Sequence, residues 1–167
     1  MKKISDEGSS LTYWSLLLDP RYLFALGFGS GLARWAPGTC GTIAALPIYW
    51  WFLATSQTYE YFFVVTISFL VGVYICGELS KKLGVPDHSC IVWDEFVGIW
   101  ITLYGLPPSI YWVMAGFVTF RLLDILKPWP IRFFDSRIKG GTGIMLDDVV
   151  AGLIGCSLLN IINNVFF

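Results

Sequence analysis

The residues of this 167-residue chain best suited to chemistry are acids that stand beside apolar stretches. Two adjacent pairs and one further acid share this placement: Asp94 with Glu95, Asp147 with Asp148, and Asp124. Carboxylates held close together cannot all ionise unless a multivalent cation compensates them. Mg²⁺ prefers oxygen ligands and commonly shares its shell with water and substrate phosphate. We therefore predict a magnesium site with Asp94, Glu95, Asp124 and Asp148 as metal ligands, and all five acids as candidate catalytic residues.

Helical spacing indicates that these acids point into the protein. Asp94 shares a helix face with Gly98 and Thr102, and Asp148 shares one with Gly152. Stripes of small residues are where apolar helices pack closely. A carboxylate on such a stripe is buried and needs a cation or a proton to compensate it. The ordinary alternative for an acid at a helix start is capping, which suits the helix dipole.

Basic residues accompany the acids in the segment 120–132. Arg121, Lys127 and Arg132 are candidate substrate-binding residues, because arginine grips phosphate oxygens with a planar fork and lysine offers a point charge. Arg121 and Asp124 are three residues apart and share a helix face, so a plain salt bridge is the alternative for this pair. The spacing is compatible with both interpretations.

Glycines cluster in the runs 27–31, GFGSG, and 37–42, PGTCGT. Glycine lets backbone amides approach an anion, and Thr42 could cap a helix whose positive end also favours phosphate. Gly38, Thr39 and Thr42 are therefore further candidate substrate-binding residues. The alternative is close packing of membrane helices, which also uses glycine.

The sequence gives little support to thiol chemistry. No pair of cysteines has zinc spacing, and no arginine follows a cysteine by six residues, as a cysteine phosphatase requires. We expect four free thiols, at Cys40, Cys76, Cys90 and Cys156. His88 is the only histidine, and a hydrogen-bonded or surface role fits it at least as well as proton transfer.

The elements that must position these residues are apolar helices. Hydrophobic residues make up 56% of the chain and charged residues 14%, with a mean hydropathy of +0.66. Soluble domains average about 45 to 50% hydrophobic and about 25% charged residues. This chain would therefore expose an aggregation-prone apolar surface to water. With a net charge of −1, the composition argues against a soluble enzyme, a disordered chain and a nucleic-acid binder.

Five apolar stretches recur along the chain: residues 43–54, 61–77, 91–106, 110–126 and 149–167. Several are shorter than the ~20 residues of a spanning helix, so we expect the third and fourth to lie inside the bundle and the first to begin near Ala36. The predicted fold is an all-α, polytopic membrane bundle of four to five embedded helices. Residues 26–167 are expected to form one catalytic domain after a cytoplasmic amino-terminal segment, 1–25, which does not resemble a signal peptide.

Basic residues predict the orientation of this bundle. All eleven Lys and Arg precede the first stretch, follow the second, or lie at or after the end of the fourth. By the positive-inside rule these segments are cytoplasmic. The connections 55–60 and 106–109 hold no Lys or Arg and are expected outside. Because the acids gather with the basic residues, we expect the active site at the cytoplasmic face.

Four long motifs resemble, in order, those of the bacterial phosphatidylglycerophosphatase A enzymes. They are GFGSG with PGTCGT in 27–42, DHSCIVWDEFVGIW in 87–100, FRLLDILKPWPIRFFD in 120–135 and GGTGIMLDDVVAG in 140–152. The resemblance implies a magnesium-dependent phosphatase in the cytoplasmic (inner) membrane of a bacterium. The implied reaction of phospholipid biosynthesis converts phosphatidylglycerophosphate to phosphatidylglycerol and inorganic phosphate. The implied partners are this phospholipid and the bilayer, with no nucleic acid.

Other membrane proteins fit the sequence less well. Phosphohistidine lipid phosphatases need a second histidine, aspartyl-phosphate phosphatases a DxDx[TV] motif, and phosphatidyltransferases a DGxxAR motif, and the chain has none of these. The remaining alternative is a small ion or proton transporter with buried carboxylates as a relay. Asn160, Asn163 and Asn164 favour it, but its path would need polar groups at mid-membrane depth rather than at one face.

The expected orientation can be tested with single cysteines introduced at Lys81 and at Glu60. In intact cells, an impermeant thiol reagent should label the cysteine at position 60 and spare the one at position 81, because the basic segment is cytoplasmic. Labelling of position 81 from outside would contradict the charge argument.

Overall fold

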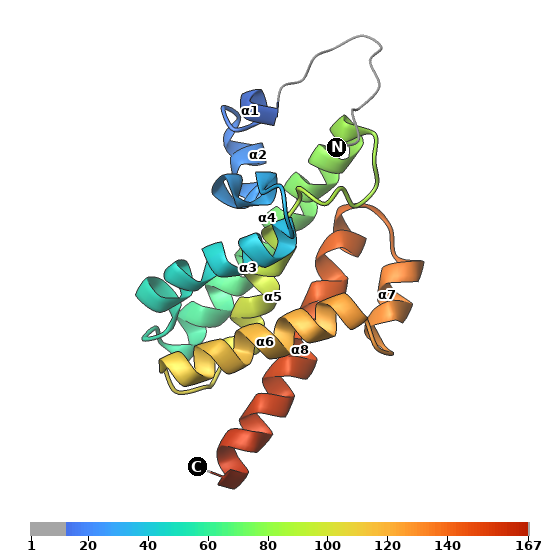
Figure 1. Ribbon diagram of the computed structural model, residues 1–167. Coiled ribbons are helices and arrows are strands. Elements are labelled where there is room, and N and C mark those ends of the chain that lie inside the picture. The colour runs from blue at the N-terminus through green and yellow to red at the C-terminus, as the bar shows by residue number, and fades with distance from the viewer. Residues whose placement is uncertain (1–12, 167) are drawn as a thin grey trace.

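The structure is a computed structural model that describes residues 13–166, so residues 1–12 and 167 lie outside the described part. Lys2, Lys3 and the first half of the expected segment 1–25 are among the residues outside it. Within the described part every regular element is a helix, which confirms the predicted all-α class (Figure 1). In chain order the elements are α1 (Tyr13–Leu16), α2 (Pro20–Ala25), η1 (Gly27–Leu32), α3 (Pro37–Ile48), η2 (Tyr49–Leu53), α4 (Thr58–Leu83), α5 (Trp93–Leu103), α6 (Ile110–Leu126), α7 (Ile131–Arg137) and α8 (Gly140–Phe166).

The short helix α5 is the centre of the fold. Every residue of α5 except Ile101 is buried, because α3, α4, α6 and α8 all pack against it. Its 11 residues span roughly 16 Å at 1.5 Å per residue, about half of a ~30 Å hydrocarbon layer. As predicted for the third apolar stretch, α5 therefore lies inside the bundle.

Buried aromatic side chains anchor α5 to its neighbours. The indole N–H of Trp93 donates to the Ser68 carbonyl of α4 at 3.0 Å, and that of Trp100 donates to the Ala45 carbonyl of α3 at 3.1 Å. The Tyr61 hydroxyl of α4 donates to the carbonyl of Trp100. A buried polar group costs free energy unless it is hydrogen-bonded, so these bonds restrict both the depth and the rotation of α5.

Two of the described helices, α4 and α8, are long and apolar enough to cross a membrane. The five apolar stretches correspond to α3 with η2, α4, α5, α6 and α8. The prediction of four to five membrane-embedded helices stays a prediction. The long helices meet at glycines: a side chain on Gly141 would collide with the Val73 carbonyl, and one on Gly72 with Met145.

The ends of the helices fall into two groups. The connections 54–57 and 104–109 meet at one end, where residues from both line a cavity of about 250 Å³. Glu60 caps its own helix there, since its carboxylate accepts from the Gln57 amide at 3.0 Å. At the other end α3 and α8 begin and α6 finishes; in Figure 1 the last turns of α6 lie beside the start of α8. The acids predicted to be functional lie at this second end.

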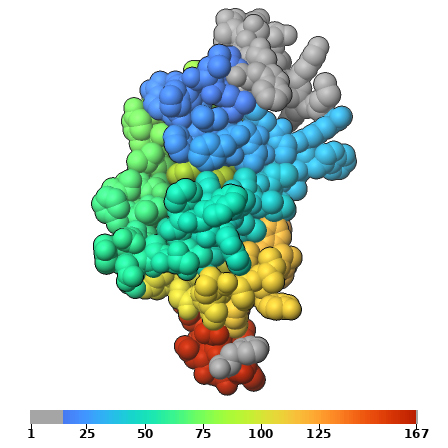
Figure 2. All heavy atoms as spheres, turned by 90° about the vertical axis from the view of Figure 1, so that its left-hand side faces the viewer, coloured from blue at the N-terminus to red at the C-terminus, as the bar shows by residue number. Residues whose placement is uncertain are grey.

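Part of the expected amino-terminal segment packs into the body of the protein. Leu16 and Tyr22 are buried, α2 contacts α4, and the Val92 amide donates to the Ala25 carbonyl at 3.0 Å. Figure 2 shows these first helices, in blue, seated on the same body as α3 and η2. The boundary between residues 25 and 26 stays a prediction.

The contact between α5 and α8 provides a test of this packing. A side chain on Gly152 would meet the Gly98 carbonyl and Ile101, so Gly152→Val should overpack the contact and lower stability by about 1 to 3 kcal/mol. Thermal unfolding in detergent measures this loss. Ser157→Val is the matched control, because Ser157 is an exposed residue of the same helix. Equal melting temperatures for the two variants would contradict the packing.

Candidate active site

A cavity of about 330 Å³ lies at the end where α3 and α5 begin and α6 finishes. Six carboxylates and two cations line it, which is a formal charge of −4 if all are ionised. Its charged lining residues are Asp87, Asp94, Glu95, Asp124, Asp147 and Asp148, with Arg121 and Lys127. The five acids singled out in the sequence are thus brought together from α5, α6 and α8.

The carboxylates form two overlapping groups that could hold a metal ion. Oxygens of Asp94, Glu95 and Asp148 lie within 4.8 Å of one another, and so do oxygens of Asp124, Asp147 and Asp148. Asp148, which belongs to both groups, is 3% exposed. A buried carboxylate oxygen without a partner is costly. Within the described part of the chain, Asp94 Oδ1, Glu95 Oε2 and Asp147 Oδ1 have no hydrogen-bond partner. This donor set suits a hard cation such as Mg²⁺ or Ca²⁺.

The helices place these acids differently. Asp94 and Glu95 lie in the first turn of α5, where the positive end of the helix favours negative charge. Asp147 and Asp148 lie two turns inside α8, because the glycine run from Gly140 is already helical. Asp148 therefore lies on the helix with Gly152, as the spacing predicted, and the buried pair needs compensation from other elements.

Arg121 compensates two of the acids from α6. Its Nη1 lies 2.8 Å from Asp124 Oδ2 and 3.8 Å from Glu95 Oε1. The salt bridge considered as an alternative for Arg121 and Asp124 is therefore formed, but it is part of the cavity wall. Nε of Arg121 is buried and has no hydrogen-bond partner among the described residues, so this N–H is a donor that the rest of the described chain does not use.

Lys127 joins α6 to α7 and α8. Its Nζ lies 2.6 Å from Asp135 Oδ1 and 2.6 Å from Asp147 Oδ2. Burial lowers the pKa of Lys127, but its hydrogen bonds to Asp135 and Asp147 outweigh this effect, so the net pKa is raised. Lys127 is therefore a fixed positive charge at neutral pH.

Asp87 lies on the loop before α5, outside the apolar helices. Burial raises the pKa of Asp87 above its usual range, with a further contribution from the negative charges of Asp135 and Asp124, while Lys127 opposes the shift. The carboxyl group therefore binds a proton more readily than an isolated aspartate. Such a group can exchange protons at the edge of the cavity.

The start of α3 provides the glycine wall of the cavity. A side chain on Gly38 would collide with the Glu95 carboxylate and the Arg121 guanidinium, so this position needs glycine. The Gly38 amide belongs to the first turn of α3, where backbone N–H groups have no intrahelical acceptor. Backbone amides at such a position can donate to an anion.

Thr42 does not cap a helix, so this expectation was wrong. The helix begins at Pro37, and the Thr42 hydroxyl donates to the Gly38 carbonyl one turn earlier at 2.9 Å. The same hydroxyl accepts from Arg121 Nη1 at 3.4 Å. Thr42 thus contacts the guanidinium of Arg121, and its role in substrate binding stays a prediction.

Two other predicted residues do not line the cavity. Thr39 lies half-buried on the first turn of α3, and Arg132 is exposed on α7. Sequence reasoning in turn missed Asp87 and Ser89, which line the cavity, and Asp135, which holds Lys127. All three belong to the motifs 87–100 and 120–135 that carry the family resemblance. Their place in these motifs could have marked them as candidate site residues.

The four cysteines are free, as predicted. Burial raises the pKa of the Cys90 thiol to about 11. A thiolate is the nucleophilic form of cysteine, so Cys90 is in the wrong protonation state for nucleophilic attack at neutral pH. This agrees with the exclusion of a thiol mechanism.

The fold and the cavity together define an all-helical protein with a carboxylate-rich site at one end of its apolar helices. The family model for phosphatidylglycerophosphatase A matches residues 23–163, and the chain belongs to this family. It is 51% identical over 148 residues to phosphatidylglycerophosphatase A of Escherichia coli (strain K12), covering 87% of this chain and 85% of the relative.

Two further relatives match most of the chain. Phosphatidylglycerophosphatase A of Haemophilus influenzae is 45% identical over 138 residues, covering 82% of this chain and 85% of that protein. A Bacteroides thetaiotaomicron protein, provisionally named a phosphatidylinositol-3-phosphatase, is 35% identical over 144 residues, covering 82% of this chain and 89% of that protein. No solved structure matches the chain.

Metal binding can be tested without measuring activity. A divalent cation should raise the melting temperature of the native protein. At a hundredfold excess over Kd, binding should increase the free energy of unfolding by about 2.7 kcal/mol. Asp148→Asn should lose this response, because Asp148 is shared by both groups, and should be no less stable without metal, because repulsion is reduced.

Glu78→Gln is the matched control, since Glu78 pairs only with the exposed Lys81 among the ion pairs of the described residues. This variant should respond to the cation as the native protein does. Equal cation responses in the native protein and in both variants would contradict the site.

Proposed function

We propose that this protein hydrolyses the terminal phosphomonoester of phosphatidylglycerophosphate, giving phosphatidylglycerol and inorganic phosphate. The observation that carries the proposal is the carboxylate cavity with its two cations in a chain of the phosphatidylglycerophosphatase A family. Water supplies the new oxygen on phosphorus, and the bond between phosphorus and the glycerol oxygen breaks. The names of two relatives support this substrate.

We propose Mg²⁺ as the cofactor, with Asp94, Glu95, Asp124 and Asp148 as ligands and Asp147 beside them. When bound, the ion would neutralise phosphate charge and help to orient the attacking water. The orphaned carboxylate oxygens of the cavity support this assignment. With the carboxylates ionised and no cation, a dianionic phosphate would meet a net negative wall.

The cations and amides of the cavity are assigned to the phosphate oxygens. Arg121 is held by Asp124 and Thr42, so its orientation is fixed before the substrate arrives. Such preorganised donors stabilise developing charge without reorganisation. Lys127 supplies a second positive charge, and the Gly38 amide a third donor. Arg132 and Thr39 do not line the cavity, and their roles in substrate binding stay predictions from the sequence.

We propose that the protein spans the cytoplasmic membrane several times with this cavity at the cytoplasmic face. Exposed aromatic residues support two interfacial belts, since Trp and Tyr favour both membrane boundaries. Trp35 and Trp129 lie next to the helix ends that bear the acids, whereas Trp51 and Tyr111 lie near the opposite ends. The basic residues favour the acid-bearing end as the inner one.

The transporter alternative is weaker for this chain. Asn160, the most promising polar residue of the last helix, donates to the Tyr104 and Cys156 carbonyls at 2.9 Å, so it satisfies backbone groups where α5 ends. A relay would also have to continue from the acids through an apolar bundle. The family of the chain supports the phosphatase.

Purified protein assayed on phosphatidylglycerophosphate tests the proposal. Inorganic phosphate should be released with Mg²⁺ and not after chelation, and Asp94→Asn, Asp124→Asn and Asp148→Asn should each lower turnover by several orders of magnitude. Glu78→Gln should retain native turnover. Full activity in all three asparagine variants would eliminate the site, and release of diacylglycerol instead of phosphate would contradict the reaction.

A further inference from the structure

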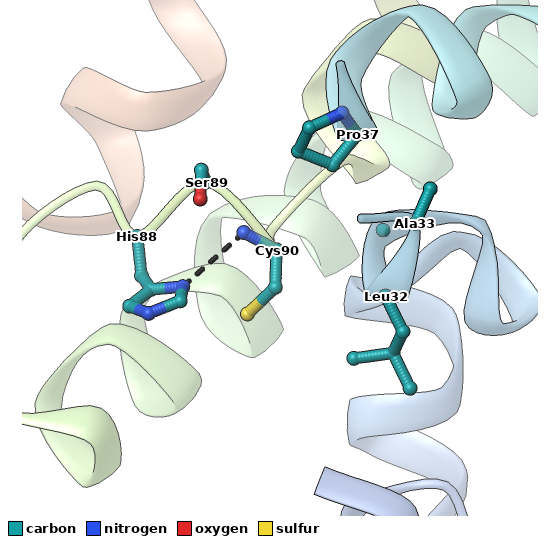
Figure 3. Close-up of a pocket in the computed structure, with 7 residues that line it drawn as sticks. Leu32, Ala33, Pro37, His88, Ser89 and Cys90 are labelled. Carbon is teal, nitrogen blue, oxygen red and sulfur yellow. Dashed lines mark hydrogen bonds between the residues drawn. The ribbon is translucent and has the colours of Figure 1, made fainter. Parts of the chain in front are cut away.

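A second cavity of about 280 Å³ adjoins the carboxylate cavity. Leu32, Ala33, Pro37, His88, Ser89 and Cys90 line it (Figure 3). Pro37 and Ser89 also line the carboxylate cavity, so the two spaces share a wall. The two cavities are therefore adjacent, and we call this second one the His88 cavity.

The walls of the His88 cavity are held in place by the backbone. A side chain on Gly31 would collide with the Cys90 carbonyl, so η1 and the loop before α5 are in close contact. The Cys90 amide donates to Nδ1 of His88 at 3.2 Å (Figure 3). Because Nδ1 accepts this bond, a neutral His88 carries its proton on Nε2.

Charge distinguishes the His88 cavity from the space on the other side of the acids. That other space, of about 210 Å³, is lined by Asp87, Asp135 and Asp147, with Lys139 as its one basic residue. Among residues 13–166, which the structure describes, no carboxylate lines the His88 cavity. An anionic group next to the reacting phosphate would be repelled by three aspartates, so the His88 cavity is the better place for it.

The proposed substrate contains such a group. Its inner phosphodiester is joined to the terminal phosphate through a single glycerol, so it must lie in a space directly beside the acids. We propose that the His88 cavity binds this glycerol and the inner phosphodiester, with His88 and Ser89 as polar contacts. This inference rests on the proposed function and identifies residues that select the lipid headgroup.

Two inhibitors separate the two cavities. Phosphatidylglycerol contains the glycerol and the diester but no monoester, whereas inorganic phosphate resembles the leaving group alone. Ala33→Leu should reduce the His88 cavity, raise KM for phosphatidylglycerophosphate and the inhibition constant of phosphatidylglycerol about tenfold or more, and leave that of inorganic phosphate within about twofold. Ala54→Leu is the matched control, since Ala54 is half-buried and lines the cavity at the opposite end.

His88 variants provide a second, independent measurement. His88→Asn keeps an acceptor where Nδ1 was and removes the Nε2 donor. It should therefore weaken the binding of phosphatidylglycerol without weakening the binding of inorganic phosphate. His88→Gln, which can place an amide donor near Nε2, should bind phosphatidylglycerol more tightly than His88→Asn does. Melting temperatures of all variants confirm that they fold.

The possible outcomes are distinct. If Ala33→Leu and His88→Asn change both inhibition constants equally, or change neither, the His88 cavity does not bind the diester. If the native protein releases no phosphate from phosphatidylglycerophosphate, the proposed function itself fails.

Discussion

The gathering of buried carboxylates in one cavity is the constraint on which the rest of the structure depends. Burying an unpaired charge in a medium of low dielectric costs free energy. Like charges also repel more strongly there than in water. The protein tolerates them because Arg121 and Lys127 each contact two acids. Three buried carboxylate oxygens still have no hydrogen-bond partner among the described residues. A bound cation would compensate the negative charge of these oxygens.

The position of α5 follows from this constraint. Two acids on a mobile helix would turn toward solvent, and the site would be lost. Trp93 and Trp100 prevent this by hydrogen bonds to α4 and α3, and Gly152 lets α8 approach closely enough to bring Asp148 next to Asp94. The packing of α3, α4, α6 and α8 around α5 therefore holds Asp94 and Glu95 toward the cavity.

The sequence predicted the acids that meet, since adjacent pairs on small-residue stripes are visible in one dimension. It did not predict where helices begin. Pro37 starts α3 five residues before Thr42, so a residue expected at a cap lies inside the helix and contacts Arg121. The glycine run at Gly140 belongs to α8, and Gly141 lets this helix lie against the Val73 carbonyl of α4. Such contacts join residues far apart in sequence.

The same limit applies to partners across elements. Arg132 and Asp135 are close in the sequence and both belong to α7, but Asp135 reaches Lys127 while Arg132 is exposed. Their fates depend on how α7 is rotated against the end of α6. No pattern of residue types within a seven-residue helix determines that rotation. The acids that line the cavity from α5, α6 and α8 were thus predictable, whereas Asp87 and Ser89 of the loop before α5 were not.

The depth of the acids explains how a lipid could reach them under the proposed orientation. The 18 residues after Asp148 in α8 span roughly 27 Å, close to the ~30 Å of a hydrocarbon layer. The acids would then lie at the boundary between hydrocarbon and headgroups, and the first two turns of α8 would stand among the headgroups. A phosphate attached to a lipid lies at this level while its acyl chains remain in the bilayer. The site therefore needs no path for extracting the substrate, only an opening between the start of α3 and the loop before α5.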